Sequence, residues 1–563
     1  MCRNGLFFDP GRKESLMAQI NVSNLTFGYD GSFDNIFENA SFSIDTDWRL
    51  GFIGRNGKGK TTFLNLLLGK YDYTGTISSN VVFDYFPYKV APKDLEKTAD
   101  SLMDLWKPGA PSWRVLCELP QLSLDPEILY RPFDTLSFGE RTKIMLAVLF
   151  SGENDFLLID EPTNHLDMAS REIIKKYLAG KKGFILVSHD RDLLDACVDH
   201  VLVLNRATIE VQKGNFSSWW ENKQRADAFS KAENEKHLKE IGKLKTAADR
   251  ASRWADKNEG TKIGFDPIRE HDRSISARAY IGAKTKKMQS RVKSFENRIG
   301  HEIEEKEGLL KNLEEPVDLK IMPLWHHKQR LVTCRDFSLK YKKSADYIIK
   351  NLTFEIAQGE RVFISGENGC GKSSLIKAIL ERVSRAGQNF AGRNLARQNL
   401  AGQSFAGRNL AGQNLAGQSF AEQQQADQLE FETFGELNTA AGLIVSYVSQ
   451  DTSHITGKLK EYAVRNSLDY TLFLSLLRQL DLERAQFDKN IKEFSDGQKK
   501  KVLIASSLLT PAHLYIWDEP LNYIDVFSRM QIEALIERYK PTMLIVEHDV
   551  RFREKLATKE IRL

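Results

Sequence analysis

Two glycine-rich stretches of the chain end in a lysine followed by a hydroxyl residue. GRNGKGKT starts at Gly54 and GENGCGKS starts at Gly366, so both fit GxxxxGK followed by Thr or Ser. Glycines at this spacing let backbone N–H groups surround phosphate oxygens, and the helix that follows adds the positive end of its dipole. Each stretch lies between an apolar, strand-like segment and a helical one. The pattern therefore predicts two nucleoside-triphosphate sites.

The polar residues of the two stretches divide into phosphate and metal roles. We expect Lys60 and Lys372 to reach the terminal phosphates, and Thr61 and Ser373 to bind Mg²⁺. The other predicted nucleotide-binding residues are Gly54, Asn56, Gly57, Gly59 and Thr62 in the first stretch, and Gly366, Asn368, Gly369, Gly371 and Ser374 in the second.

Each predicted site also has two adjacent acids and a histidine. The acids end an apolar segment in FLLIDEP and again in LYIWDEP, and the histidine ends the next one in FILVSHD and MLIVEHD. We expect the aspartate in the Mg²⁺ shell, the glutamate to polarise the attacking water, and the histidine to contact the γ-phosphate. Surface acids and a structural histidine are the alternative interpretation. These residues are Asp160, Glu161 and His189, and Asp518, Glu519 and His548.

The same blocks return in the same order, so the chain contains one catalytic domain twice. We place the two copies at residues 17–215 and 329–563, after a leader or alternative start at residues 1–16. In each copy, short apolar segments alternate with helical ones. This pattern is typical of an α/β fold with a parallel sheet that binds its ligands at the strand C-termini.

A further block points to a family. LSFGE at 136–140 and FSDGQ at 494–498 are similar to the signature LSGGQ, and with the other blocks they make the chain resemble the ATP-binding-cassette (ABC) superfamily. The resemblance implies ATP as the nucleotide, Mg²⁺ as its metal, and hydrolysis to ADP and phosphate. It also implies an intramolecular sandwich, in which the signature of one domain closes the other domain's site, and a tyrosine on adenine. The residues that it adds are Ser137, Gly139, Glu140, Ser495, Gly497 and Gln498 in the signatures, and Tyr29 and Tyr341 at adenine.

The two copies differ near the predicted metal. Gln450 fits the family position that binds Mg²⁺ and orients water, whereas the matching residue of the first copy is Tyr88. The second copy also has Leu521 and Tyr523 in place of the Thr and His of DEPTNHLD. A tyrosine cannot take the place of glutamine as a metal ligand, so we expect two competent but unequal sites.

The charge of the chain is concentrated rather than large. The net charge is +4, but residues 241–300 hold 15 Lys+Arg against 7 Asp+Glu, which favours a polyanionic partner at that segment. No apolar run approaches the ~18 residues that span a bilayer. Five scattered cysteines are typical of a reducing compartment. We therefore expect a cytoplasmic chain with no transmembrane segment.

The basic segment belongs to a long link between the copies, residues 216–328. Apolar residues recur there every three or four positions, from Leu238 to Trp254 and from Met288 to Leu310, which predicts two helices in a coiled-coil hairpin. Gly and Pro residues place the tip of the hairpin at about 258–276. A plain spacer is the alternative. The tip residues that we expect to act on a partner are Lys262, Ile263, Phe265, Pro267 and Ile268.

Tandem ABC domains joined by such a hairpin resemble the ABC-F family. FSSWWENK after the first copy and ARAYIGAKTKKMQSR on the return helix carry this resemblance. It implies a monomeric ATPase at the ribosomal E site, with 23S rRNA and P-site tRNA as partners. The segment VVFDYFPY looks closest to the antibiotic-resistance branch, which displaces drug from the peptidyl-transferase region. A housekeeping translation factor and the ATP-binding subunit of a drug exporter are the alternatives.

Five-residue units such as AGQSF and AGRNL fill most of an insertion at about 384–430 in the second copy. They partly resemble pentapeptide repeats, but about 35 residues would give fewer than two turns of such a coil. The units also return at an interval of fifteen residues, as tandem duplication would produce. We favour a flexible surface insertion over a folded contact module.

Overall fold

The computed structural model describes residues 19–29, 35–152, 155–164, 166–204, 209–260, 286–287, 290–295, 297–303, 320–342, 346–398, 431–480 and 482–563. The chain forms two compact units, Met1–Ser217 with Val317–Leu563 and, separately, Ser218–Pro316. Both copies of the repeated domain belong to the first unit, and most of the link forms the second. In the described ranges, no helix combines the length and the apolar character that crossing a membrane requires.

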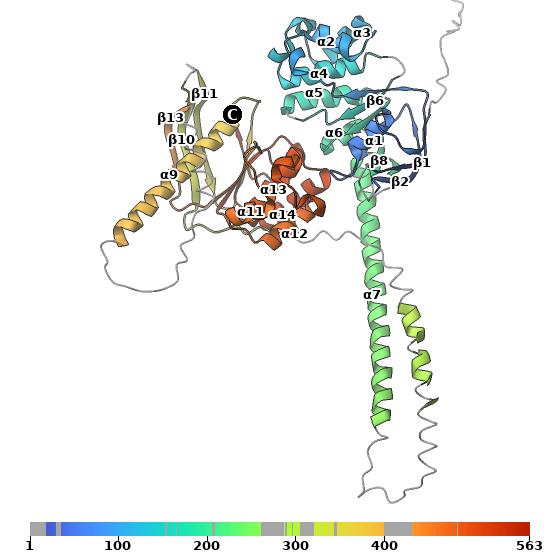
Figure 1. Cartoon of the computed structure of the whole chain (residues 1–563). Helices are drawn as coiled ribbons and strands as arrows, with labels where there is room; N and C mark the ends of the chain where they lie inside the picture. Colours follow the sequence, from blue (N-terminus) through green and yellow to red (C-terminus); the bar gives the residue numbers. More distant parts are fainter. Residues whose placement is uncertain are drawn as a thin grey trace, which may run out of the picture. The chain divides into compact units, whose positions relative to one another are not determined.

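The first copy contains two sheets (Figure 1). An antiparallel sheet has the order β2-β1-β4, and a six-stranded sheet has the order β5-β6-β7-β3-β8-β9, in which only the β8–β9 pair is antiparallel. The elements are β1 (Gln19–Phe27), β2 (Phe37–Asp45), β3 (Arg49–Ile53), α1 (Lys60–Leu67), β4 (Thr74–Ser78), β5 (Val82–Phe86), α2 (Ala99–Trp106), α3 (Ser112–Glu118), α4 (Phe138–Leu149), β6 (Asp155–Asp160), α5 (Met168–Ala179), β7 (Phe184–Val187), α6 (Arg191–Cys197), β8 (His200–Leu204) and β9 (Ile209–Lys213).

The second copy repeats this plan. Its antiparallel sheet has the order β11-β10-β13, and its parallel sheet has the order β14-β15-β16-β12-β17. The elements are β10 (Arg330–Tyr341), β11 (Tyr347–Ala357), β12 (Arg361–Ser365), α9 (Lys372–Gln398), β13 (Phe431–Thr439), β14 (Val445–Val448), α11 (Leu459–Arg465), α12 (Tyr470–Gln479), α13 (Asp496–Leu509), β15 (Leu514–Asp518), α14 (Val526–Tyr539), β16 (Met543–Val546), α15 (Val550–Leu556) and β17 (Lys559–Arg562).

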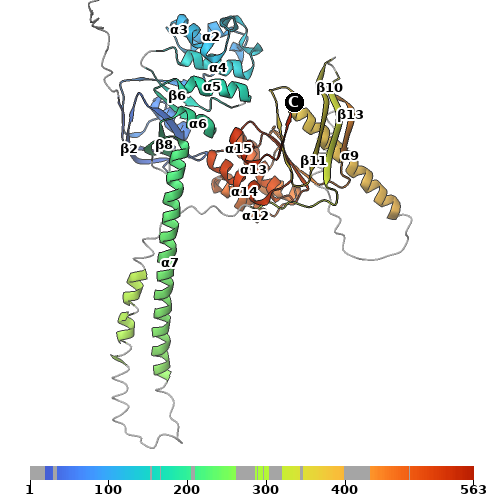
Figure 2. The same cartoon turned by 180° about the vertical axis from the view of Figure 1, so that it is seen from behind.

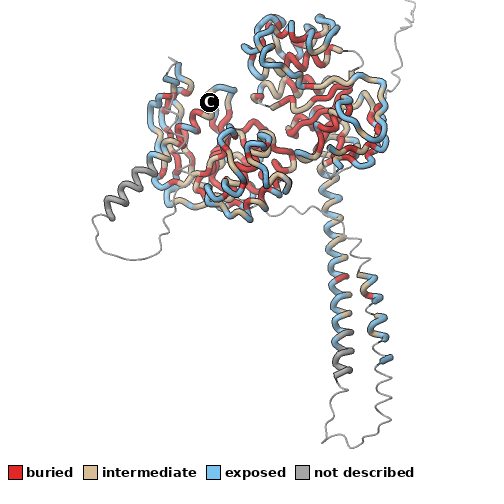
Figure 3. The backbone as a smooth tube through the Cα atoms, viewed as in Figure 1, coloured by how far each residue is buried: buried red, intermediate tan, exposed pale blue. Residues whose placement is uncertain are grey.

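Parallel strands that are covered on both faces form the centre of each copy, which is why FILV and MLIV are apolar throughout. In the first copy, Phe63 of α1 contacts Phe52 of β3 and Phe37 of β2, with ring centroids 5.5 Å and 6.0 Å apart. The helix after the phosphate loop is thereby fixed between the two sheets. Figure 3 shows the buried residues gathered in these cores. The predicted α/β class and the duplication are confirmed.

The insertion lies on the connection from the helix after the phosphate loop to the third strand of the antiparallel sheet. In the first copy this connection, between α1 and β4, is residues 68–73. In the second copy α9 continues to Gln398, so the first units of the repeat are helical. Ala, Gln, Arg and Leu favour helix, which accounts for this extension of α9. The flexible insertion stays a prediction. The remaining units lie outside the described residues.

The second unit contains most of α7 (Phe216–Gly260) and a helical segment at residues 290–303, of which 296 is not described. Figures 1 and 2 both show this segment beside α7. Ile241 on α7 and Ile299 on the segment are both buried. The predicted tip residues, Lys262 to Ile268, lie outside the described residues, so the complete hairpin stays a prediction.

The inward stripe of α7 differs by one position from the prediction. Leu238 is 56% exposed, whereas His237 and Leu244 are half-buried on either side of buried Ile241. Positions 237, 241, 244 and 248 share one face because steps of four and three residues follow the helix period. An apolar side chain alone was therefore a poor guide to the stripe on so polar a helix.

Candidate functional site

The loops after β3 and β12 require glycine where phosphate binding was predicted. Gly59 and Gly371 have φ angles of 107° and 100°, a region that strains other residues. A Cβ at Gly59 would lie 2.4 Å from Ile36 Cγ2, and one at Gly371 would lie 2.6 Å from Ile348 Cγ2. In each copy an isoleucine, Ile36 just before β2 or Ile348 in β11, therefore packs against the loop at the start of the following helix.

Each loop lysine turns toward the backbone of its own loop. Lys60 Nζ donates to the carbonyl oxygen of Gly54 at 2.7 Å, and Lys372 Nζ donates to that of Gly366 at 2.9 Å. The two lysines are only 8% and 7% exposed. A buried ammonium group surrounded by carbonyl oxygens favours an anionic ligand, and a phosphate would supply it.

The predicted adenine-stacking tyrosines lie beside the helices that follow these loops. Tyr29 Oη is 2.9 Å from Thr62 Oγ1, and Tyr341 Oη is 3.0 Å from Ser374 Oγ. The tyrosines are 44% and 39% exposed, so each keeps surface on which a base can stack. Their role at adenine stays a prediction.

The residues predicted to bind Mg²⁺ come together at the ends of β6 and β15. Thr61 Oγ1 donates to Asp160 Oδ2 at 3.1 Å. Burial raises the pKa of Asp518 to about 6, and a hydrogen bond from Ser373 opposes that shift. Among the described residues, the buried Oδ1 atom of Asp518 has no hydrogen-bond partner. A carboxylate and a hydroxyl oxygen are hard ligands that fit Mg²⁺.

The two candidate general bases share one backbone geometry. Glu161 and Glu519 have φ angles of 52° and 46°, in the left-handed region that non-glycine residues rarely adopt. His189 Nε2 lies 3.3 Å from Glu161 Oε1, and His548 Nε2 lies 3.7 Å from Glu519 Oε1. The structure thus brings each predicted glutamate to its predicted histidine.

The electrostatics of the two glutamates differ. Burial raises the pKa of Glu161 to about 8, and the charge of Asp160 adds to the shift. Burial also holds the pKa of His189 well below its ordinary value. Burial acts on Glu519 in the same direction, but a hydrogen bond and a charge interaction with His548 outweigh it, so its pKa is lowered. The pKa values of the two glutamates are therefore shifted in opposite directions.

The residues that follow β5 and β14, the strands beside β6 and β15, also differ between the two copies. The registers of β5 on β6 and β14 on β15 make Tyr88 the counterpart of Gln450. Gln450 Nε2 donates to Glu519 Oε2 at 2.9 Å. Tyr88 Oη instead donates to Asp84 Oδ2 at 2.7 Å, away from the acids of its own site.

A tyrosine that the sequence motifs did not indicate lies at each predicted metal site. Tyr85 Oη donates to Asp160 Oδ2 at 3.1 Å. Its equivalent is Tyr447, whose pKa is raised by burial and by the charge of Asp518. The tyrosine that DYF and SYV share in the two copies was the available signal.

The signature residues begin α4 and α13 with reciprocal caps. Ser137 Oγ accepts from the backbone N–H of Glu140 at 3.2 Å, while the Glu140 carboxylate accepts from the N–H of Ser137 at 2.8 Å. Ser495 and Gln498 form the same pair of hydrogen bonds. These capping boxes fix each serine hydroxyl at a helix N-terminus, where an anion is favoured.

The glycine of each signature makes room for a neighbouring segment of the same copy, a loop at Gly497 and helix α5 at Gly139. A Cβ at Gly497 would lie 2.9 Å from the carbonyl oxygen of Tyr523. A Cβ at Gly139 would lie 3.0 Å from Ser170 Oγ. This packing explains why both copies have glycine here, whereas the preceding position accepts the exposed Phe138.

The first phosphate loop contacts the second copy. Asn56 Nδ2 donates to the carbonyl oxygen of Tyr523 at 2.8 Å, and Lys58 Nζ lies 3.1 Å from Glu483 Oε1. The two copies therefore meet at the edge of a candidate site. The closed sandwich around ATP stays a prediction.

Comparison with known proteins gives consistent matches along the chain. A family model described as ABC transporter matches residues 37–164 and 349–522, together more than half of the chain. The chain is 26% identical to the ribosome protection protein VmlR of Bacillus subtilis over 96% of this chain and 86% of that protein. It is 24% identical to the erythromycin resistance ATP-binding protein MsrA of Staphylococcus epidermidis over 92% of each. The fold is similar to that of an archaeal ribosome recycling factor, aABCE1, solved with the ribosomal stalk protein aP1. That structure has a TM-score of 0.55 at 17% identity, covering 96% of this chain and 87% of its own.

Proposed function

We propose that this chain, which belongs to the ATP-binding-cassette family, binds the ribosomal E site and protects the large subunit by displacing antibiotic from the peptidyl-transferase region. The family match covers both copies, so the chain is an ATP hydrolase with two ABC domains. Its resemblance to the ABC-F family is confirmed by relatives that span nearly its whole length. It acts in the cytoplasm, where 23S rRNA and P-site tRNA are its partners.

The unit between the two ABC domains is the observation that carries this proposal. VmlR matches 96% of this chain, so the match includes most of Ser218–Pro316. Residues 241–300 hold 15 Lys+Arg against 7 Asp+Glu, which suits contact with nucleic-acid phosphates. A helical unit with this charge gives the ATPase a segment suited to contact with RNA.

The chemistry of the ABC domains follows from the site geometry. When bound, ATP with Mg²⁺ supplies a terminal phosphate that water can attack. Lys60 and Lys372 would neutralise phosphate charge, and the hydroxyl–aspartate pairs would hold the metal. Glu161 and Glu519 would accept the proton of the attacking water, because each lies at the end of its strand beside a histidine.

One experiment separates ATP binding from hydrolysis on the ribosome. The variant Glu161→Gln/Glu519→Gln should bind ATP but lose turnover, because a glutamine cannot accept the water's proton. With ATP it should co-sediment with 70S ribosomes, whereas the wild type should dissociate after hydrolysis. Turnover near the wild-type level, or sedimentation with membranes rather than ribosomes, would contradict the proposal.

A second experiment tests antibiotic protection. Residues 262–268 are replaced by a Gly/Ser loop of equal length, and drug susceptibility is measured in cells that lack the native gene. ATP turnover and ribosome association should persist, while resistance falls to that of cells without the gene. As a matched control, Lys286→Glu/Lys287→Glu should weaken ribosome association itself. Full resistance with the replaced tip would favour a housekeeping translation factor or an exporter subunit.

A further inference from the structure

Helices α6 and α15 occupy equivalent positions after the histidines of the two sites. β7 and β16, which lead into them, pair in the same register with β3 and β12. An aspartate caps each helix, Asp190 in the first copy and Asp549 in the second. Counting on from these caps makes Asp192 the equivalent of Arg551.

Helices α5 and α14 are equivalent in the same detail. Asp167 and Asp525 cap them by accepting from the N–H three residues on. Four residues after each cap, an arginine donates from Nε to the carbonyl oxygen of the residue just before the cap. These pairs are Arg171 with Leu166 and Arg529 with Ile524. Lys175 on α5 is therefore the equivalent of Glu533 on α14.

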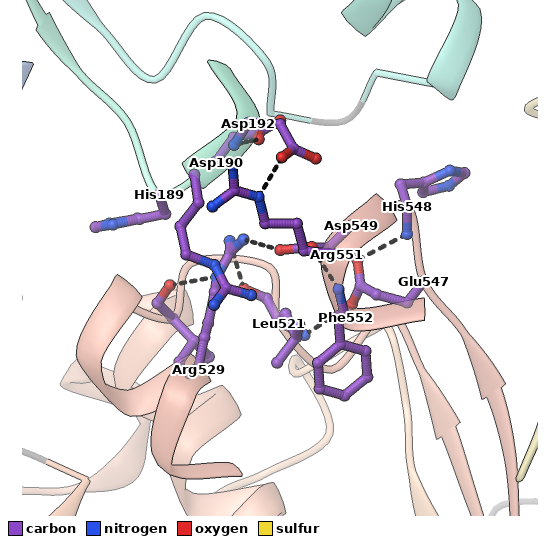
Figure 4. Close-up of polar contacts among 12 residues, drawn as sticks. His189, Asp190, Asp192, Leu521, Arg529, Glu547, His548, Asp549, Arg551 and Phe552 are labelled. Carbon is purple, nitrogen blue, oxygen red and sulfur yellow. Dashed lines mark hydrogen bonds and ion pairs between the residues drawn. The ribbon is translucent and has the colours of Figure 1, made fainter. Parts of the chain in front are cut away.

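Residues of α6 meet residues of α14 and α15 where the two copies contact each other. Figure 4 shows Arg551 of the second copy reaching Asp192 of the first. The same guanidinium donates to Asp195 Oδ2 at 2.7 Å. Arg191 of α6 forms a two-bonded ion pair with Glu533 of α14, and one of these bonds is 3.3 Å long. Arg191 and Glu533 are 7% and 2% exposed, so this ion pair is buried in the contact.

Asp192 of the first copy thus pairs with Arg551, the residue at the equivalent position of the second copy. In a contact with two-fold symmetry, a residue next to the axis faces its own equivalent. A two-fold relation between the copies would therefore place this ion pair beside its axis. Since the position has opposite charge in the two copies, the contact is complementary only between unlike copies.

Pairing of like copies would remove or reverse these interactions. Two first copies would bring Asp192 against Asp192 and Arg191 against Lys175. Two second copies would bring Arg551 against Arg551 and leave the buried carboxylate of Glu533 facing an apolar Val550. Like charges in contact and a buried charge without a partner both select against an association.

We propose that this charge pattern determines which surfaces pair: the first copy, through Arg191, Asp192 and Asp195, docks only on Glu533 and Arg551 of the second. The partner of each ABC domain is then the other half of its own chain, and two chains do not associate through like domains. This selectivity deepens the domain pairing of the proposed ATPase and holds whether or not the chain acts on ribosomes.

The test uses full-length chains in which the charges of one copy are reversed. Variant A carries Arg191→Glu and Asp192→Arg, and variant B carries Glu533→Arg and Arg551→Asp. Each variant alone places like charges at the 191–533 and 192–551 pairs, while Asp195 stays unchanged in both, so ATP turnover should fall by about tenfold or more. The chain with all four substitutions restores opposite charges, and it should regain turnover within about threefold of wild type as a monomer.

Mixing the two variants gives a second and more specific readout. The first copy of A then has charges opposite to those of the second copy of B. The other pairing, between the first copy of B and the second copy of A, involves only wild-type residues. An equimolar mixture should regain ATP turnover and elute as a dimer of one A and one B chain in light-scattering chromatography. Neither variant alone should form such a dimer. The charge reversals alone would thus make the ABC domains of one chain pair with those of another.

The control is Glu554→Arg, an exposed charge on the same helix α15. It should keep wild-type turnover and a monomeric mass. The proposal is overturned if variants A and B keep full turnover, if the fourfold variant or the mixture recovers nothing, or if the control loses as much turnover as variant B. Ribosome binding is not part of the readout, so failure here leaves the proposed function standing.

Discussion

Gln450 donates a hydrogen bond from Nε2 to Oε2 of Glu519 at 2.9 Å, which joins a metal-binding candidate to the candidate general base of the second site. In the first site, the equivalent Tyr88 donates to Asp84 instead. One chain therefore has two sites that differ in how the candidate general base is held.

This difference predicts a site-specific effect of Gln450→Ala. In the Glu161→Gln background, where only the second site hydrolyses ATP, the substitution should lower steady-state phosphate release by about tenfold or more. In the Glu519→Gln background it should have little effect, because the first site does not use this residue. Tyr88→Phe is the matched control and should leave the first site active. Equal losses in both backgrounds would contradict the assignment.

The two glutamates should give different pH profiles. Glu161 has a pKa raised to about 8 and acts as a base only when ionised, so kcat/KM of the first site should fall below pH 8, approaching tenfold per pH unit. The pKa of Glu519 is lowered, so the second site should show no such fall between pH 6 and 9. Measuring kcat/KM across this range in the Glu519→Gln and Glu161→Gln variants separates the two sites. Superimposable profiles would rule out the difference.

The signature glycines should tolerate alanine unequally. At Gly497 a Cβ would meet the backbone oxygen of Tyr523, which cannot rotate away, so Gly497→Ala should cost about 1–3 kcal/mol of stability. At Gly139 the Cβ would meet Ser170 Oγ, a side-chain atom that can rotate. Thermal unfolding should therefore show a lower midpoint for Gly497→Ala than for Gly139→Ala. The reverse order would disprove this account of the packing.

Removing the repeat should leave the ATPase intact. Joining Ser384 to Asp427 ends α9 at Ser384 and shortens the connection to β13, and the entropy of closing a loop changes only slowly with its length. Turnover, ribosome co-sedimentation and the thermal midpoint should stay near wild type. A soluble deletion protein without ATPase activity would make the repeat part of the folded domain.

Features that depend on local spacing were accessible from the sequence. The positive φ angles of Gly59 and Gly371 and the capping boxes of Ser137 and Ser495 follow from short-range backbone requirements. Buried parallel strands were visible as apolar runs for the same reason. Each of these features recurs in the second copy, so the internal duplication acted as a check on every local prediction.

Features that depend on how distant surfaces meet were not accessible. Arg551 and Asp192 are far apart in the chain, and their pairing becomes visible only when the two copies are in contact. The hydrogen bond from Tyr85 to Asp160 depends on side-chain orientation across neighbouring strands. On α7, the half-buried His237 replaced Leu238 in the inward stripe, because helix rotation and not hydrophobicity decides which residue faces inward.

The connection that carries the repeat also indicates where the two copies tolerate a change in chain length during evolution. β13 pairs with β10 and β4 pairs with β1 in the same antiparallel sense, although the connection that leads into β13 is much longer than the one into β4. Two halves that began alike have thus diverged in length at this point while keeping the same pairing. Such a point suits the insertion of foreign sequence. An affinity or fluorescent tag placed after Gln398 would label one half of the molecule and leave its twin unmarked, so that the two halves can be followed separately in living cells.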